Sequence, residues 1–494
     1  MVRAKKTAIK PSERVSLFSQ LTLYRYRYII GYAVFAAALL FLVLFNFPNL
    51  PSGLSQGEID SAASASMLDW SSFRDGTVAA TDLPFHLMQK ISLKLFGPTM
   101  FALRLPTVIL ALLAGVVLER LLKRLFHENV AIVSTIIAIS TILFLTVAHS
   151  GSPMVMNIFL TTTILYLLVR ILHGDKAQPV WVILLAIAVV LGLYSPMFSV
   201  LIFLALLLLF HPKARARIRK MPKAHLIVTA AVVVPFLVPL VLGLSLNGLE
   251  TLKSLIGFGT WRGLTDNVGA MAGILFGINA GGTVSEFVPP VINMASLAVA
   301  LIGLIRLFMS LKSARSYLLL LWLIVLVPIL LFNTSAIPLT FVPFTILTAM
   351  GVDGLITGWN RYFPINPYAR IAGLIPIFVL MFGIAYTTAQ RYMLANVYEA
   401  NVVTAHNLTL PAIMNEVQAG ADVKVLIGES ESQIADIFKN RAEVKTSGFS
   451  NDGRLIVTPE AYHEHESELN SWRLRRIETS QLQNDSVILR IYEK

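Results

Sequence analysis

Long apolar runs recur between residues 29 and 388, and they constrain the fold more than any other feature of this sequence. A run of about 20 apolar residues is the length that an α-helix needs to cross the hydrocarbon core of a bilayer. The composition agrees, because 56% of the 494 residues are hydrophobic and 14% are charged, whereas about 25% are charged in a typical soluble domain. The sequence therefore predicts a polytopic α-helical membrane protein.

The apolar runs define about eleven candidate transmembrane helices. They cover residues 29–47, 104–122, 129–148, 153–172, 179–194, 196–210, 226–246, 289–309, 317–333, 338–358 and 371–388. The fifth and sixth runs are short and meet at "YSPM", so the count depends on reading them as two helices. Together the runs predict a transmembrane domain over residues 29–388.

The charge of the loops predicts the orientation of the chain. Lys and Arg accumulate in the cytoplasmic loops of membrane proteins, and here the loops after the even-numbered runs are basic, as in "HPKARARIRKMPKAH". The segment 1–28 is also basic, while the opposite loops "AHSGSP" and "NTSAIP" contain no Lys or Arg. We therefore expect a cytoplasmic N-terminus and an extracytoplasmic C-terminus in the cell (cytoplasmic) membrane. This pattern explains the net charge of +12 without a nucleic-acid partner.

Two loops on the expected outer side are long, at residues 48–103 and 247–288. The first contains "LPFHLMQKISLKLFG", in which apolar residues recur at helical spacing with two lysines on another face, a pattern typical of a helix along the membrane surface. After the last run, "VKVLIGES", "RLIVTPEAY" and "SVILRIYEK" predict strands, and "SESQIADIFKN" predicts a helix. Residues 389–494 are therefore expected to form a small extracytoplasmic α/β domain.

The sequence offers no clear site for a cofactor. The absence of cysteine excludes disulfides and thiolate metal ligands. The motif "HEHE" at residues 463–466 would place two histidines on one face of a strand, but no further ligand cluster accompanies it. A solvated surface patch is the better interpretation, and we predict no metal site.

Two acids, Glu58 and Asp60, lie in "LSQGEIDSAASASMLDW", shortly after the first apolar run. A carboxylate beside a membrane-embedded cavity can act as a general base on an acceptor hydroxyl or amine, and partial burial raises its pKa toward that task. The same residues fit the start of a helix, where acids are favoured by the helix dipole. Both interpretations are open from the residues alone.

The segment around these acids resembles the GT-C membrane glycosyltransferases, in particular the branch of protein O-mannosyltransferases and aminoarabinose transferases. The resemblance rests on Asp82-Leu83-Pro84-Phe85-His86, Leu95-Phe96-Gly97 and Arg104-Leu105-Pro106, which match the order and spacing of the family's motifs. The long outer loop after the seventh run and the outer C-terminal domain agree with the family's topology. Residues 54–125 match closely, and the rest matches in topology.

The sequence departs from the family at three places. The family's catalytic Asp aligns near Gln56 or Gly57, which leaves Glu58 as the second acid of an Asp-Glu pair and Asp60 as a replacement for the first. Pro153-Met154 stands where the family often has Pro-Asp. The segment "AIPLTFVPF" lacks the cation that meets the donor phosphate in the family. A member that has lost catalysis is therefore an alternative.

The resemblance implies a donor sugar on polyprenyl phosphate, whose phosphate needs cations or N–H donors near the membrane. Arg262 beside Trp261 is the best candidate, with an interfacial aromatic and basic pair as the alternative. Asp82 and His86 are further candidate substrate-binding residues. Arg104 is expected to be a helix-end residue whose charge reaches the interface.

Our leading prediction is an integral membrane glycosyltransferase of the cell envelope. It would move a sugar from a polyprenyl-phosphate donor to a lipid, glycan or protein acceptor on the extracytoplasmic face, with Glu58 or Asp60 as the base. Its partners would be these substrates and the membrane lipids, and no cofactor is expected. The alternatives are a non-catalytic scaffold with the same fold and a lipid or glycan transporter. The lack of an internal repeat counts against transport.

Overall fold

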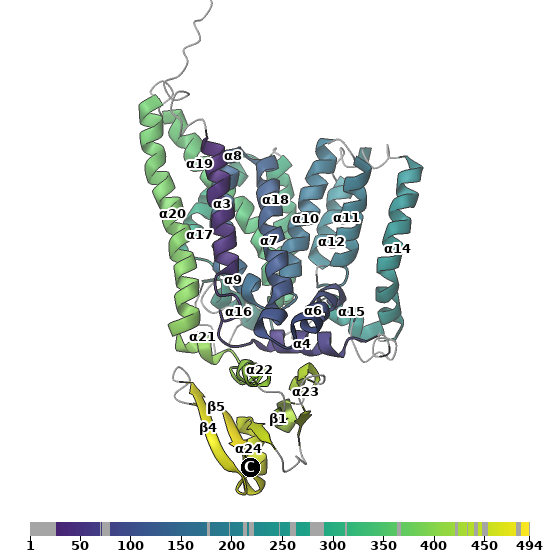
Figure 1. The fold of residues 1–494 in the computed structure, drawn as a ribbon. Coiled ribbons are helices and arrows are strands. Elements are labelled where there is room, and N and C mark those ends of the chain that lie inside the picture. Colours follow the sequence, from purple (N-terminus) through teal and green to yellow (C-terminus); the bar gives the residue numbers. More distant parts are fainter. Residues whose placement is uncertain are drawn as a thin grey trace, which may run out of the picture.

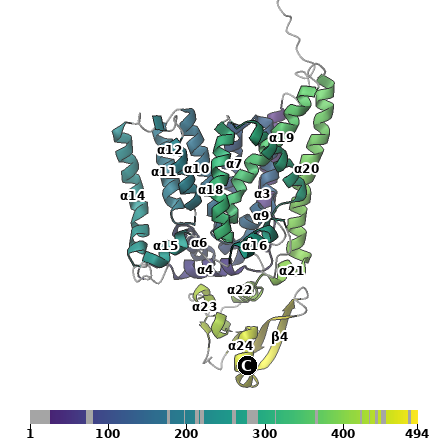
Figure 2. The same cartoon turned by 180° about the vertical axis from the view of Figure 1, so that it is seen from behind.

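Apolar helices pack side by side along most of the chain, and a small domain with a β-sheet lies beyond one end of them (Figures 1 and 2). The structure is a computed structural model, and it describes residues 26–69, 71, 80–174, 178–196, 198–210, 215–216, 222–246, 248–256, 263–276, 291–311, 314–362, 367–419, 423–431, 433–438, 443–446, 453–480 and 486–493. The small domain follows the last long helix, so it is the C-terminal one.

The predicted apolar runs fold as the helices of the bundle. These are α3 (Arg27–Leu44), α7 (Met100–Leu125), α8 (Glu128–Ile139), α9 (Ile142–His149), α10 (Met154–His173), α11 (Gln178–Gly192), α12 (Phe198–Phe210), α14 (Lys223–Leu246), α17 (Met294–Met309), α18 (Ala314–Phe332), α19 (Phe341–Tyr362) and α20 (Pro367–Tyr398). Each run overlaps one of these helices, except that 129–148 is divided between α8 and α9. The helix α20 continues beyond the predicted end of the last run.

The number of membrane spans is less well defined than the helices themselves. Within the described residues, five helices are long and apolar enough to cross a membrane alone, and the bent pair α8 and α9 makes a sixth. The two members of that pair meet at an angle of 60°, and Thr141 caps α9 by accepting a hydrogen bond from the backbone N–H of Phe144. Other apolar helices, such as α17, are shorter. The total of about eleven transmembrane helices therefore stays a prediction.

Four shorter helices lie at the bundle end that faces the C-terminal domain (Figure 1). They are α4 (Gln56–Met67), α6 (Leu83–Phe96), α15 (Gly248–Ile256) and α16 (Leu264–Phe276). The first two come from the first long loop and the last two from the second, and a 3-10 helix, η1 (Thr334–Thr340), precedes α19. The helix predicted in "LPFHLMQKISLKLFG" of the first loop is thus present as α6.

The helix α6 has its apolar side outward. Leu87, Ile91 and Leu95 are more than half exposed, whereas His86 and Gln89 are buried. In water this arrangement would be unfavourable, but it suits a helix whose outer side touches lipid. The predicted surface helix is confirmed as a helix, and its buried side supplies polar groups to the bundle end.

The C-terminal domain is a mixed five-stranded sheet covered by helices. Its strands are β1 (Val423–Leu426), β2 (Glu443–Lys445), β3 (Arg454–Val457), β4 (Arg473–Ser480) and β5 (Ser486–Glu493), in the spatial order β2-β1-β3-β5-β4. Its helical elements are α21 (Ala400–Thr404), α22 (Thr409–Ala419), η2 (Glu429–Glu431), α23 (Gln433–Phe438) and α24 (Pro459–Leu469). The strand β1 is parallel to both its neighbours, and β5 is antiparallel to both of its own.

Alternate residues of the central strands pack in opposite directions. Val425 and Ile456 face the cluster that includes α22 and α23, while Leu426 and Leu455 face the cluster with α24. This follows from the two-residue period of a strand. The histidines of "HEHE" lie on α24, so the strand considered for them is wrong. The helix is kinked at His465, whose backbone is not helical (φ −121°).

The helices α17 and α19 approach each other more closely than side chains would allow. A Cβ atom added to Gly351 would lie 2.0 Å from the backbone oxygen of Val299. One added to Gly303 would lie 1.9 Å from the backbone oxygen of Leu347. Small residues at helix contacts are how membrane helices bring their backbones together. The two glycines therefore fix this helix pair.

Replacing Gly351 with alanine should destabilise the bundle, because the methyl group must push α17 and α19 apart. We expect a cost of about 1–3 kcal/mol, seen as a lower midpoint of thermal unfolding in detergent. Gly358→Ala on the same helix is the matched control, because nothing lies within 4 Å of the added Cβ there. Equal midpoints for the two variants would contradict the close contact.

Candidate functional site

The helix α4 begins with a capping box that uses Glu58. The hydroxyl of Ser55 accepts a hydrogen bond of 3.3 Å from the N–H of Glu58, and the N–H of Ser55 donates one of 2.9 Å to Glu58 Oε2. This reciprocal pair satisfies two backbone donors that a helix start would otherwise leave free. The capping interpretation of Glu58 is therefore confirmed, and it fixes the carboxylate at the first turn of α4.

The same carboxylate forms a buried ion pair with Arg104 of α7. Arg104 Nε lies 3.0 Å from Glu58 Oε1, and both side chains are fully buried. The N–H of Gly151 donates a further hydrogen bond of 2.6 Å to Glu58 Oε1. The remaining guanidinium groups donate to the backbone oxygens of Phe47, Pro48, Pro51 and Gly53. The expectation that the charge of Arg104 reaches the interface is wrong, because these acceptors hold it inside the protein.

Asp60 lies on a different side of α4 from Glu58. Two residues apart on a helix are about 200° apart around its axis, and Asp60 is exposed where Glu58 is buried. Its Oδ1 accepts a hydrogen bond of 2.8 Å from the side-chain amide of Gln56, one turn earlier. The structure thus separates the two candidate catalytic acids: one is held in the core and one is open to its surroundings.

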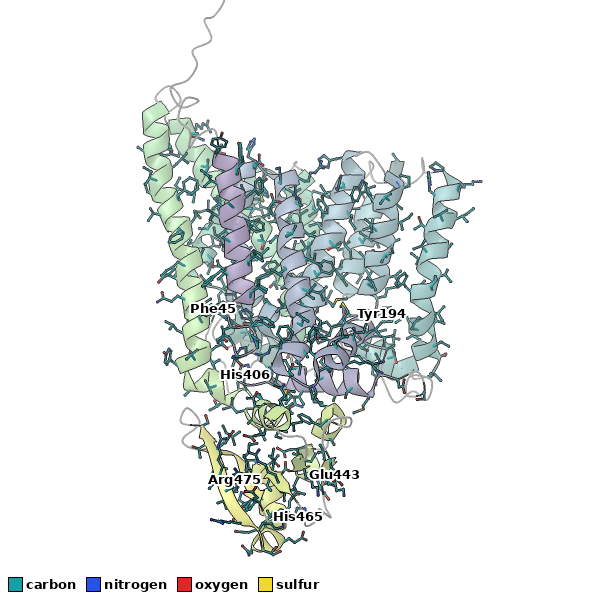
Figure 3. The ribbon with its side chains drawn as sticks, viewed as in Figure 1. Phe45, Tyr194, His406, Glu443, His465 and Arg475 are labelled. Carbon is teal, nitrogen blue, oxygen red and sulfur yellow. The ribbon has the colours of Figure 1, made fainter. Side chains whose placement is uncertain are left out.

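Asp82 and His86 occupy the first turns of α6. Asp82 has a left-handed backbone with φ of 54°, and its N–H donates to the backbone oxygen of Tyr194 at 2.7 Å. Its Oδ1 accepts a bond of 2.5 Å from the hydroxyl of Ser195. Burial raises the pKa of Asp82 to about 6. In Figure 3, Tyr194 lies beside this end of the bundle.

His86 is the least satisfied polar side chain of this region. Its ring is 8% exposed, and its Nδ1 has no hydrogen-bond partner in the described part of the chain. Burial lowers the pKa of His86 to about 4, so the ring is neutral at neutral pH. Asp82 and His86 are thus neighbours on one helix turn, where the backbone N–H of His86 donates to the oxygen of Asp82.

Gln89 connects three segments of the site and was not singled out from the sequence. Its Oε1 accepts from the hydroxyl of Ser61 on α4 at 2.8 Å. Its Nε2 donates to the backbone oxygens of Leu103 at 3.2 Å and Gly151 at 2.9 Å. Gln89 is fully buried, so these bonds replace its contacts with water. A glutamine among the lysines of an amphipathic segment gives no signal of this role.

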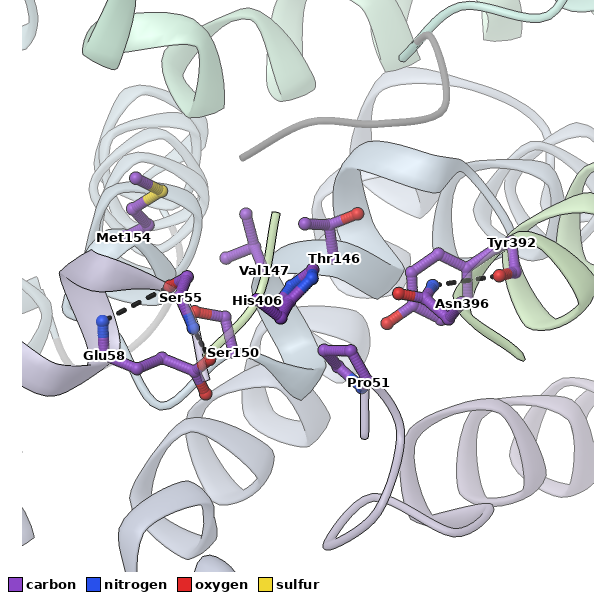
Figure 4. A pocket seen from close by; sticks show the side chains of 10 residues that line it. All are labelled: Pro51, Ser55, Glu58, Thr146, Val147, Ser150, Met154, Tyr392, Asn396 and His406. Atoms are coloured by element: carbon purple, nitrogen blue, oxygen red, sulfur yellow. Dashed lines mark hydrogen bonds between the residues drawn. The ribbon is translucent and has the colours of Figure 1, made fainter. Parts of the chain in front are cut away.

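A narrow pocket lies between the start of α4 and the end of α20 (Figure 4). Its volume is about 20 Å³, which is room for about one water molecule. A sugar ring therefore does not fit beside Glu58 in this conformation. The pocket is lined by Pro51, Ser55, Glu58, Thr146, Val147, Ser150, Met154, Tyr392, Asn396 and His406. Tyr392, Asn396 and His406 were not predicted from the sequence, because they come from the far end of the chain.

The C-terminal domain packs directly onto the loop that contains Glu58. Leu54 and Asn407 form an isolated antiparallel bridge, with backbone bonds of 2.9 and 2.8 Å. Ile59 of α4 lies in one hydrophobic cluster with Ile413 and Met414 of α22. Figure 3 shows His406 at this junction, between the bundle and the sheet. The domain is therefore a fixed cover of this side of α4.

Two candidate residues, Trp261 and Arg262, lie outside the described residues. Within those residues, no group of three or more His, Asp or Glu side chains could hold a metal ion. The donor-phosphate contact predicted at Arg262 therefore stays a prediction.

Comparisons with known proteins agree with this arrangement. Residues 83–241 match the family described as dolichyl-phosphate-mannose-protein mannosyltransferase. No curated protein matches the sequence of the chain. The crystal structure of ArnT from Cupriavidus metallidurans in the apo state is similar over 94% of this chain and 98% of that one, with a TM-score of 0.53 and 13% identity. The resemblance to the GT-C membrane glycosyltransferases is thereby confirmed.

Two further structures contain a lipid phosphate. ArnT from Cupriavidus metallidurans bound to undecaprenyl phosphate matches with a TM-score of 0.52 and 11% identity, over 94% of this chain and 98% of that one. The archaeal oligosaccharyltransferase AglB from Archaeoglobus fulgidus, in complex with an inhibitory peptide and a dolichol-phosphate, matches with a TM-score of 0.51 and 12% identity. The chain covers 70% of AglB, and 89% of the chain is matched. At these identities the likeness is one of fold.

Removing the charge of Arg104 should destabilise the protein strongly. In Arg104→Met, Glu58 stays buried without its partner, which costs about 3–5 kcal/mol. Thermal unfolding in detergent would measure the loss, with Lys94→Met on the exposed side of α6 as the control. The double variant Glu58→Gln with Arg104→Met should recover part of the loss. If Arg104→Met unfolds at the same temperature as the control, the ion pair does not hold this region together.

The stability of the protein should depend on the protonation of Asp82. Because the pKa in the folded state, about 6, lies above the usual value, the folded state binds this proton more tightly than the unfolded state. Its contribution is therefore full below the ordinary pKa of 3.8 and is lost as the pH rises through 6. Asp82→Asn, which keeps the acceptor for Ser195, should raise the unfolding midpoint at pH 8 and change it little at pH 4.

His86 serves as a control, because its contribution to stability should depend on pH in the opposite direction to that of Asp82. Its pKa is lowered in the folded state, so His86 stabilises the protein above its usual pKa and loses that contribution as the pH falls toward 4. His86→Gln should therefore lose less stability than the wild type as the pH falls toward 4. The shift in unfolding midpoint that Asp82→Asn causes at pH 8 should not change. A pH profile that is identical in wild type and Asp82→Asn would contradict the burial of the carboxyl.

Proposed function

We propose that this chain, which has the fold of the GT-C membrane glycosyltransferases, transfers a sugar from a polyprenyl-phosphate donor to an acceptor outside the cytoplasm. The observation that carries the proposal is the fold match with ArnT, which covers 94% of this chain and 98% of the other. The donor class is supported by the undecaprenyl phosphate and dolichol-phosphate of similar structures. The acceptor would be a lipid, a glycan or a protein.

Asp60 is the better candidate for the general base. An ionised carboxylate offers about four lone-pair sites, and Glu58 receives four N–H donors: one from Ser55, one from Gly151 and two from Arg104. No site remains on Glu58 for the proton of an acceptor. Asp60 is exposed, and among the described residues its carboxylate is bonded through one oxygen to Gln56. We therefore assign Glu58 to positioning α4 and Asp60 to proton transfer.

The proposed reaction is a single displacement at the anomeric carbon. The acceptor oxygen or nitrogen attacks this carbon, its proton passes to Asp60, and the bond to the phosphate oxygen breaks. Polyprenyl phosphate leaves with the electron pair, and the configuration of the sugar inverts. A cation near the membrane would stabilise the leaving phosphate, and Arg262 with Trp261 remains our candidate for that contact. Asp82 and His86 would contribute polar contacts to a substrate from the first turns of α6.

A non-catalytic scaffold is the second candidate function. It is favoured by the role of Glu58, which is fully occupied as a structural ion pair, and by the absence of an acid at Gln56 and Gly57. In that case the protein would hold a lipid-linked sugar or a partner without transferring the sugar. The lipid or glycan transporter considered from the sequence gains no specific support.

Transfer should be lost in Asp60→Asn. Purified protein in nanodiscs would be given labelled polyprenyl-phosphate sugars and a mixture of lipid, glycan and peptide acceptors. General-base removal typically lowers a rate about 10²–10⁴-fold, and we expect a loss in this range with an unchanged unfolding midpoint. Asp69→Asn removes another exposed acid of the same loop and should keep the wild-type rate.

The outcomes separate the two functions. Normal transfer by Asp60→Asn would refute its role as the base. No transfer by the wild type from any of the donors, although the protein is folded and binds them, would favour the scaffold. For Glu58→Gln we expect a lower unfolding midpoint as well as lower activity, since it disturbs the position of α4 rather than the chemistry.

A further inference from the structure

The two halves of α14 differ in how far the rest of the protein covers them. The near half, toward the C-terminal domain, contains the buried residues Leu240 and Gly243. In the far half, the described side chains of residues 223–231 are exposed, except that of Thr229, which is half-buried. At 100° per residue these side chains point in most directions around the helix axis. The far half therefore has few protein neighbours among the described residues, and Figures 1 and 2 show α14 at the edge of the bundle.

The helix α11, on which α14 packs, is divided in the same way. Ala188, Val190 and Gly192 in its near half are buried, whereas Val180 and Leu184 in its far half are exposed. The two helices thus meet near the C-terminal domain and leave apolar side chains of their far halves uncovered. Lipid tails are as apolar as these side chains, so little free energy separates a lipid-filled gap from direct contact of the two helices.

The near half of α14 is anchored to the end of the bundle. A Cβ atom added to Gly243 would lie 2.5 Å from the Cβ of Ala80, shortly before α6. The hydroxyl of Thr251 on α15 donates to the backbone oxygen of Gly243 at 3.4 Å. A third contact comes from Tyr194, in the turn between α11 and α12, whose hydroxyl donates to the backbone oxygen of Phe236 at 2.5 Å.

The hydroxyl of Tyr194 lies within the hydrogen-bond ladder of α14. Besides donating to Phe236, it accepts a bond of 3.2 Å from the backbone N–H of Leu240. The carbonyl of Phe236 and the N–H of Leu240 are four residues apart, so they would bond each other in an undisturbed α-helix. A side chain inserted into the ladder is a recognised cause of helix bending. The backbone oxygen of Tyr194 accepts from Asp82 at 2.7 Å, which links this point of α14 to the start of α6.

Two prolines weaken α14 at the same place. Pro235 and Pro239 lie inside the helix, and each lacks the N–H that would donate to the carbonyl four residues earlier. With the N–H of Leu240 bonded to Tyr194, regular ladder bonds are lost or shared at three neighbouring points. The helix should therefore bend most easily at residues 235–240, which lie between its anchored half and its uncovered half.

We propose that residues 235–240 are a hinge, about which the far half of α14 closes onto the far half of α11. The structure shows the open arrangement. Closure would bring the uncovered apolar side chains of both helices together and displace the lipid between them, while the near half, held by Tyr194, keeps its place. Because Tyr194 is also bonded to Asp82, the hinge is coupled to the first turn of α6. The inference goes beyond the proposed function, because it requires no sugar transfer.

Double electron–electron resonance would test the motion in the full-length protein in nanodiscs. The chain has no cysteine, so two spin labels can be placed by introducing two cysteines. Val180→Cys with Ile227→Cys labels the exposed far halves of α11 and α14, and we expect two distances, for the open and the closed arrangement. Leu95→Cys with Leu246→Cys reports on the near ends and should give one narrow distance. One narrow distance for the far pair would overturn the proposal.

Restoring the ladder should reduce the closed population. The double variant Pro235→Ala with Pro239→Ala regains both backbone donors, and we expect the shorter distance of the far pair to lose about fivefold of its population. Pro376→Ala is the matched control, because Pro376 lies inside another apolar helix, α20, and it should leave both distances unchanged. An unchanged population in the double variant, with a normal unfolding midpoint, would refute the hinge.

The role of Tyr194 has its own test. Tyr194→Phe keeps the ring but removes the hydroxyl that anchors α14, so the distance distribution of the near pair should become broader. Tyr386→Phe removes a hydroxyl from an exposed residue of α20 and should have no effect on either pair. A near pair as narrow in Tyr194→Phe as in the wild type would refute the anchoring role. These measurements need no sugar donor, so they can succeed or fail independently of the proposed transferase.

Discussion

The buried ion pair between Glu58 and Arg104 is the interaction on which the end of the bundle depends. Both charges are removed from water, and such a pair is tolerable only when every donor and acceptor has a partner. Here that condition is met by the capping box of α4, by the N–H of Gly151 and by four carbonyl groups of the preceding loop. Because these partners come from separate segments, the pair determines how the first loop, α4 and α7 meet. Loss of either charge would disturb all of them.

The C-terminal domain is positioned by the same loop. Leu54, directly before the capping box, pairs with Asn407, and Ile59 shares a hydrophobic cluster with the helices of the domain. A Cβ atom at Gly53 would lie 2.7 Å from His406, which shows how closely the two backbones approach. The domain is therefore firmly attached, because the surface on which it packs consists of the residues around the ion pair. A change at Arg104 would reach the sheet through this contact.

The sequence allowed the helical class, the ranges of most helices, the surface helix α6 and three of the strands to be predicted. These features could be predicted because each follows from the spacing of apolar residues within a single segment. The strand β4 was not predicted, because it is an exposed edge whose residues show no alternation of apolar and polar side chains. The burial of Arg104 depends on partners 46 to 57 residues away in the sequence, and the pocket with Tyr392 and Asn396 joins segments hundreds of residues apart. Local patterns do not contain that information, and the Glu58 motif alone fitted both a cap and a base.

The outward apolar side of α6 has a consequence for where this protein works. Leu87, Ile91 and Leu95 give the helix an affinity for the boundary between acyl chains and head groups, while Gln89 ties it to α4 and α7. Because these bonds hold α6 to the bundle, a bilayer of different thickness must adjust its own surface to the level of α6. Asp60 and Asp82, at the same end of the bundle, are thereby kept close to the head groups.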